Sequence, residues 1–177
     1  MAETQERARE ALAGTMLREG ILGGLLAGAI FAVAQMLLAA AMGVSPWTPW
    51  AFFASILLGR AALEAAFTPS IFVVGFVTHA ILSALFGLLW GAIAKSVAPG
   101  IRDNWGPHAA AATIYGLLLW LVNFQVIGRI VYPWVLESGS LAQVLLHAFA
   151  FGLPLGLWLC ARLRPIELAP RRRRATV

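Results

Sequence analysis

The chain has 177 residues, of which 60% are hydrophobic and only 12% are charged. A soluble domain carries about 45–50% apolar and about 25% charged residues, so this composition excludes a water-soluble globule and a disordered chain. The net charge is +5, and the basic residues stand at the ends of the apolar segments. We therefore expect contacts with anionic lipid at the cytoplasmic face, and no binding of nucleic acid.

The N-terminal residues 1–19 are polar and of mixed charge, which predicts a short cytoplasmic helix that leads into the first span. Four apolar segments follow, each long enough to cross about 30 Å of hydrocarbon as a helix that rises about 1.5 Å per residue. These predicted spans are residues 21–43, 70–94, 109–131 and 141–161. We predict an all-α membrane protein with a four-helix transmembrane domain over residues 20–162, because lipid offers no partner for unpaired backbone groups. A basic cytoplasmic tail is expected over residues 163–177.

Residues 47–67, between the first two spans, could form a fifth span or a helix in the membrane interface. Four spans with both termini in the cytoplasm leave only Arg60 and Arg129, of the 13 Lys and Arg residues, on the outer side. A fifth span would move most of the basic residues outside, against the positive-inside rule. The sequence therefore predicts an amphipathic interfacial helix here, with Trp47 and Trp50 as interfacial anchors.

Small residues recur at every fourth position in three of the spans, a spacing that lets helix backbones approach closely in lipid. The glycines concerned are Gly20, Gly24, Gly28, Gly87, Gly91, Gly152 and Gly156. We expect a tightly packed bundle, in which these ridges serve either internal packing or another subunit. Pro154 is expected to kink the fourth helix and free a carbonyl near Ala150.

The two halves of the chain share a faint order of features: a helix with an amide side chain, a Pro-Trp pair, and a helix with a histidine. These are Gln35, Pro46-Trp47 and His79 in the first half, and Asn123, Pro133-Trp134 and His147 in the second. Because each half contributes two spans, the pattern suggests a two-fold parallel repeat of helix pairs.

Four polar side chains fall within the predicted spans at similar depth: Gln35, His79, Asn123 and His147. Each lies about three or four residues to the outer side of its span's midpoint, roughly 5 Å at about 1.5 Å per residue. Facing lipid would be costly, so each is expected to point into the bundle. His108, in the inner loop after Pro107, is expected at the surface.

This polar layer has three open interpretations. It could be a hydrogen-bonded layer that fixes helix register. It could hold haem b between His79 and His147, with the propionates near Arg60 and Arg129. It could also be a metal or proton site that uses the two histidines.

No set of nucleophile, base and orienting residue is visible, and there is no phosphate-binding loop or HExxH motif. We therefore expect no catalysis by this chain alone. The prediction is an accessory subunit of a larger membrane complex, such as a respiratory one. A haem b redox protein and a small membrane carrier are the alternatives.

Six short segments recur in order in a group of bacterial four-span membrane proteins. They are FAVAQM (31–36), SPWTPW (45–50), THAILS (78–83), VNF (122–124), YPW (132–134) and HAFAFG (147–152). The chain resembles this group over about residues 20–160. The resemblance implies the four-span fold and a location in the bacterial inner membrane, and it carries over no catalytic residues. A glutamate often stands in that group where this chain has Gln35, so a carboxylate function there would be absent.

Overall fold

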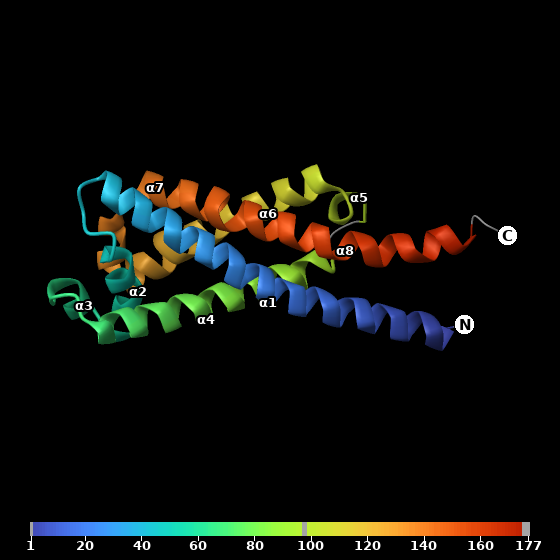
Figure 1. Cartoon of the computed structure of the whole chain (residues 1–177), viewed down its shortest axis with the longest axis horizontal. Coiled ribbons are helices and arrows are strands. Elements are labelled where there is room, and N and C mark those ends of the chain that lie inside the picture. The colour runs from blue at the N-terminus through green and yellow to red at the C-terminus, as the bar shows by residue number, and fades with distance from the viewer. Residues whose placement is uncertain (1, 97–98, 175–177) are drawn as a thin grey trace.

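The computed structural model describes residues 2–96 and 99–174, and the described part of the chain is helical apart from short connections (Figure 1). In chain order the elements are α1 (Ala2–Ala41), α2 (Thr48–Leu58), α3 (Ala61–Glu64), α4 (Pro69–Ala94), α5 (Pro99–Arg102), α6 (Trp105–Trp120), η1 (Leu121–Gly128), η2 (Pro133–Ser138), α7 (Ser140–Leu145), η3 (Leu146–Gly152) and α8 (Leu153–Arg174). Among them, four stretches are long and apolar enough to cross a membrane: Gln5–Ala41, Pro69–Ala94, Trp105–Gly128 and Leu141–Leu163. The predicted four-helix membrane bundle is confirmed.

Helices α1 and α8 extend beyond the bundle at the end where both termini lie (Figure 1). The predicted N-terminal helix leads into the first span without a break, because α1 continues from Ala2 to Ala41. Nothing in this stretch interrupts a helix, and the chain turns only at Gly43, which has a φ of 73°. The predicted basic tail over residues 163–177 is helical as far as Arg174, and its side chains after Leu163 lie outside the described residues.

The segment predicted as one interfacial helix consists of α2 and α3, separated at Gly59, where φ is 73°. Helix α2 packs against α4 at the end of the bundle opposite the termini, hereafter the α2 end (Figure 1). Its close approach depends on Gly75 of α4, where a Cβ atom would meet the Trp50 carbonyl. Trp50, expected as an interfacial anchor, is buried against α4 with 7% of its surface exposed, whereas Trp47 is 46% exposed.

The glycine ridges hold the helices together in two pairs. A Cβ atom on Gly24 of α1 would collide with the Ser83 carbonyl and with Gly87 of α4. In the other half, a Cβ atom on Gly152 would collide with the Ala112 carbonyl of α6. The ridges therefore serve packing inside this chain, and each half of the sequence supplies one close helix pair.

Pro154 is accommodated by the π-helical segment η3 that precedes it. Proline has no N–H to donate and its ring clashes with the carbonyl four residues earlier. At the end of η3 the Leu153 N–H bonds the carbonyl of Ala148, five residues back, which is the wider π-helical turn. A second π-helical segment, η1, continues α6. Such turns occur often at functional sites.

The end of the bundle nearer the termini is closed by packed side chains. Met16, Leu155, Leu159 and Leu163 are at most 1% exposed. Helices α4 and α6 are joined there by the Tyr115 hydroxyl, which donates to the Phe86 carbonyl at 2.8 Å.

The expectation of a surface position for His108 was wrong. Its side chain is 1% exposed, and its Nδ1 lies 2.7 Å from the Arg102 carbonyl. Its ring packs edge-on against Trp90 with 5.7 Å between ring centroids.

Candidate functional site

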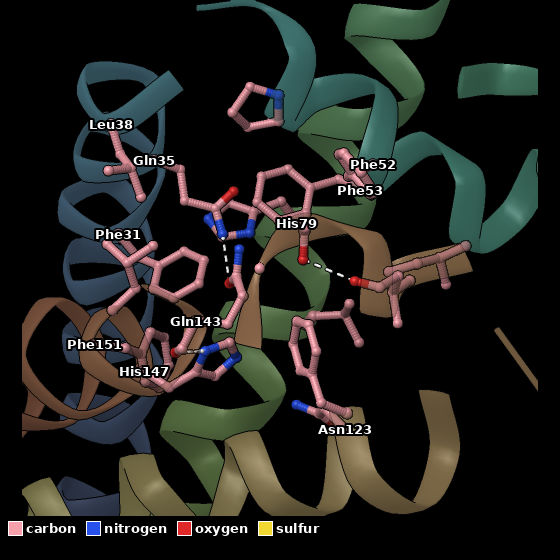
Figure 2. A pocket seen from close by; sticks show the side chains of 18 of the residues that line it. Phe31, Gln35, Leu38, Phe52, Phe53, His79, Asn123, Gln143, His147 and Phe151 are labelled. Atoms are coloured by element: carbon pink, nitrogen blue, oxygen red, sulfur yellow. Dashed lines mark hydrogen bonds between the residues drawn. The ribbon is translucent and has the colours of Figure 1, made fainter. Parts of the chain in front are cut away.

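A cavity of about 610 Å³ lies inside the α2 end of the bundle (Figure 2). Its walls come from α1, α2, α4, η1 and η3, and most of the side chains that line it are aromatic or aliphatic. Phe86, Leu119 and Phe151 lie toward the closed end of the bundle. The exposed lining residues cluster at the α2 end and mark the mouth: Met42, Val44, Ile127, Glu137 and Gly139.

The four polar residues predicted to share one depth all line this one cavity: Gln35, His79, Asn123 and His147. They come from α1, α4, η1 and η3, one from each spanning segment. The structure adds a fifth polar side chain, Gln143 of α7, which is 6% exposed.

Gln35 and Gln143 form an amide pair across the cavity wall, in which Gln35 Nε2 donates to Gln143 Oε1 at 3.1 Å (Figure 2). The sequence analysis missed Gln143, although it falls within the predicted fourth span. The available signal was its spacing of four residues from His147, which places both on one helix face.

His79 is held at its edge by a backbone group and on its faces by two aromatic rings. Its Nε2 lies 2.8 Å from the Gly28 carbonyl. The ring stacks on Phe53 with 4.2 Å between centroids and, less closely, on Phe31 at 5.9 Å. Gly28 permits this approach, because a Cβ atom there would collide with the Ser83 side chain.

His147 is held by its own helix, since its Nδ1 lies 2.7 Å from the Gln143 carbonyl. Phe31 meets this imidazole edge-on, with 4.8 Å between centroids. The same phenyl ring therefore contacts both histidines, and with 5% of its surface exposed Phe31 forms a fixed part of the cavity wall.

Asn123 is half-buried in η1 and lines the cavity apart from the amide pair (Figure 2). Among the described residues, its side chain has no hydrogen-bond partner. Its amide is thus available to a molecule in the cavity.

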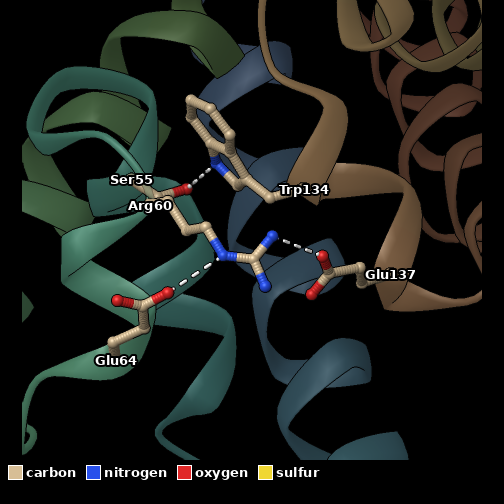
Figure 3. Close-up of polar contacts among 5 residues, drawn as sticks. All are labelled: Ser55, Arg60, Glu64, Trp134 and Glu137. Carbon is tan, nitrogen blue, oxygen red and sulfur yellow. Dashed lines mark hydrogen bonds and ion pairs between the residues drawn. The ribbon is translucent and has the colours of Figure 1, made fainter.

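Arg60 and Arg129, predicted as propionate partners, do not line the cavity. Arg60 donates to Glu64 at 3.0 Å and to Glu137 at 2.8 Å (Figure 3). The hydrogen bond to Glu64 is the largest cause that raises the pKa of the Arg60 guanidinium above its ordinary value. The hydrogen bond to Glu137 raises it further. Arg129 donates to Gln125 at 2.9 Å.

The ion pair between Arg60, which follows α2, and Glu137 of η2 lies beside a contact between α2 and η2, in which the Trp134 indole N–H donates to the Ser55 hydroxyl at 2.9 Å (Figure 3). Glu137 also lines the mouth of the cavity. The two contacts therefore hold α2 against η2 next to the opening.

No family model, no curated protein and no solved structure matches this chain. These comparisons identify no family.

The two histidines do not fit haem b in this arrangement. Each histidine keeps one ring nitrogen unpaired among the described residues, but for His79 this is Nδ1, because its Nε2 faces the Gly28 carbonyl. Phe31 also packs against both imidazoles, where a porphyrin would have to lie. Within the described residues, no cluster of three or more His, Cys, Asp or Glu side chains could hold a metal ion.

The amide pair should stabilise the bundle measurably. In a double-mutant cycle with Gln35→Leu and Gln143→Leu, we expect a coupling energy of about 0.6–2 kcal/mol, the range of hydrogen bonds between membrane helices. The free energy of unfolding in mixed micelles gives the value. Strictly additive losses would show that the two amides do not interact in the folded protein.

Proposed function

We propose that this protein binds a small, uncharged, lipid-soluble molecule within the membrane. The observation that carries the proposal is the cavity of about 610 Å³, with apolar walls and a few convergent polar side chains. Binding sites for small molecules are typically clefts of about 300–1,000 Å³ with the same mixture of apolar lining and few polar groups. A layer that served only to fix helix register would need hydrogen bonds but no space.

The chemistry of the lining supports binding rather than catalysis. Glu137 at the mouth is its one acidic side chain, and it is paired with Arg60. Among the described residues, no acid–base pair or activated nucleophile lines the inner part of the cavity.

A carrier would use the same cavity and is the nearest alternative. It needs access from both sides, whereas the end of the bundle beyond Phe86 and Phe151 is filled by side chains of at most 1% exposure, such as Leu155 and Leu159. In this conformation the end nearer the termini is closed by these side chains, which favours a binding role.

The accessory-subunit hypothesis is weakened by the packing of the glycine ridges. It drew on glycine ridges left free for a partner, but Gly20, Gly24, Gly87 and Gly91 face one another between α1 and α4. Docking to a larger complex, such as a respiratory one, remains a separate proposal, which copurification in mild detergent would test.

We further propose that the mouth of the cavity faces the outer side of a bacterial inner membrane. The support is the charge distribution, since all but two of the 13 Lys and Arg residues lie toward the opposite side of the spans. Because Arg60 and Arg129 both lie at the α2 end, the positive-inside rule places that end outside.

The proposal is tested by cross-linking in lipid nanodiscs with a neutral aryl diazirine that carries a short alkyl chain. We expect cross-links on cavity residues such as Phe53 and Phe124. Leu82→Trp fills part of the cavity from α4 and should lower that labelling at least about tenfold, equivalent to about 1.4 kcal/mol of binding free energy. Leu82 lines the cavity and is half-buried.

The matched control is Leu85→Trp, which places the same indole on the same helix at a position that is 52% exposed and outside the cavity. It should leave cavity labelling unchanged. Cross-links confined to lipid-facing positions such as Val73, or equal cavity labelling in both variants, would refute a binding site inside the bundle.

A further inference from the structure

The two cavity histidines have fixed tautomers, because each places one ring nitrogen against a backbone carbonyl. A carbonyl oxygen only accepts hydrogen bonds, so the facing nitrogen must carry the proton. His147 therefore has its hydrogen on Nδ1, facing the Gln143 carbonyl at 2.7 Å. His79 has its hydrogen on Nε2, facing the Gly28 carbonyl at 2.8 Å. In the neutral imidazole the other nitrogen is then an acceptor.

These second nitrogens, His79 Nδ1 and His147 Nε2, are open to the cavity. Nε2 of His108 is fully buried and has no hydrogen-bond partner. Neither His79 nor His147 has a ring nitrogen that is both fully buried and unpaired. Both imidazoles line the cavity, and among the described residues neither open nitrogen has a hydrogen-bond partner. The cavity thus presents two unpaired acceptors, on the two imidazoles that contact Phe31.

The amide groups nearby supply the complementary donors. Gln143 uses its Oε1 to accept from Gln35, which leaves its own NH₂ group free. Asn123 has both its amide donor and its acceptor free. A hydroxyl group both donates and accepts, so it can satisfy an imidazole nitrogen and an amide together.

A cationic ligand would meet the same acceptors, but the burial of its charge would be unfavourable. The acid in the lining, Glu137, lies at the mouth, where it pairs with Arg60 at 2.8 Å. The inner cavity offers aromatic and aliphatic walls and uncharged polar groups. Transfer of an unpaired ion into such surroundings is strongly unfavourable.

We propose, on the basis of the proposed function, that the ligand is a neutral apolar molecule with a hydroxyl group, which donates its hydrogen to His147 or His79. A ring-borne hydroxyl, as in a phenol or quinol, and a chain-borne hydroxyl, as in a long-chain alcohol, share this chemistry.

The test uses two matched pairs as competitors of the diazirine cross-linking. The first is 4-pentylphenol against 4-pentylanisole, which differ only in that the ether lacks the hydroxyl hydrogen. The second is 1-octanol against its methyl ether. We expect the hydroxyl compound to compete at least about tenfold more strongly in one pair or both, since the ether leaves a buried acceptor unpaired. The pair with the larger advantage identifies the ring-borne or chain-borne source.

His147→Phe and His79→Phe locate the acceptor. Each keeps a planar ring in place but removes the open nitrogen, so at least one variant should bring phenol and ether to equal potency. An advantage retained in both variants, or equal competition in the wild-type protein, would overturn hydroxyl recognition while the cross-links still showed a cavity ligand. Failure of the diazirine to label the cavity would instead overturn the proposed function itself.

A second measurement requires no variant. The ¹⁵N chemical shifts of His79 and His147 should show opposite neutral tautomers, Nε2–H for His79 and Nδ1–H for His147. Addition of 4-pentylphenol should move the resonance of an unprotonated nitrogen, and 4-pentylanisole should not. A proton on either cavity-facing nitrogen in the free protein would overturn the proposal.

Discussion

Gly24→Leu should abolish the close packing of α1 on α4 and lower the free energy of unfolding by about 3 kcal/mol, the upper end of the usual range for overpacked cores. A Cβ atom at this position would meet the Ser83 carbonyl and the Gly87 backbone, rather than a side chain that can move aside. In lipid the helices gain little from hydrophobic burial, so their association depends on such close contact. The helices must then separate, and the cavity wall between them is lost.

The matched control is Gly14→Leu in the same helix. A Cβ atom on Gly14 meets nothing within 4 Å, and leucine is the better helix former. We expect this variant to be as stable as the wild type or slightly more so. Reversible unfolding in mixed micelles, followed by circular dichroism, compares the two. Equal losses would mean that the α1–α4 contact is not the close backbone contact described above.

The spans themselves were predictable because length and apolar composition suffice to define a helix that crosses a membrane. The same holds for the glycine pairs, where spacing alone indicated close contact. The polar residues before Ile21 belong to the same helix as the first span, because no residue between the polar and apolar parts of α1 breaks a helix.

The cavity could not be predicted from the sequence, although its polar residues could. Depth along a span follows from residue number, and the four residues that it groups all line the cavity: Gln35, His79, Asn123 and His147. Empty space depends on how far the helices stand apart, which is set by packing between distant segments. Two such features line the cavity here: α2, which folds against α4, and the π-helical segments η1 and η3 of the second half.

Phe31→Ala should have the second large effect, because this ring is the one contact shared by both cavity histidines. It packs against His79, His147 and Phe151, with ring centroids 5.9, 4.8 and 6.4 Å away. Loss of a buried phenylalanine costs about 3–5 kcal/mol in a soluble core. In a bilayer the hydrophobic gain from leaving water is absent, so only the packing of about three ring pairs is lost. We therefore expect Phe31→Ala to lower the free energy of unfolding by about 2 kcal/mol.

The variant should also loosen ligand recognition, since removal of the ring enlarges the cavity between the two imidazoles. We expect weaker discrimination between 4-pentylphenol and its methyl ether, with Phe31→Leu intermediate in both stability and discrimination. The control is Phe149→Ala in η3, whose side chain is 57% exposed and lies outside the cavity. It should change the free energy of unfolding by no more than about 0.5 kcal/mol, as is usual for surface positions. If Phe31→Ala left stability unchanged but Phe149→Ala did not, the phenyl ring could not be what holds the two histidines in place.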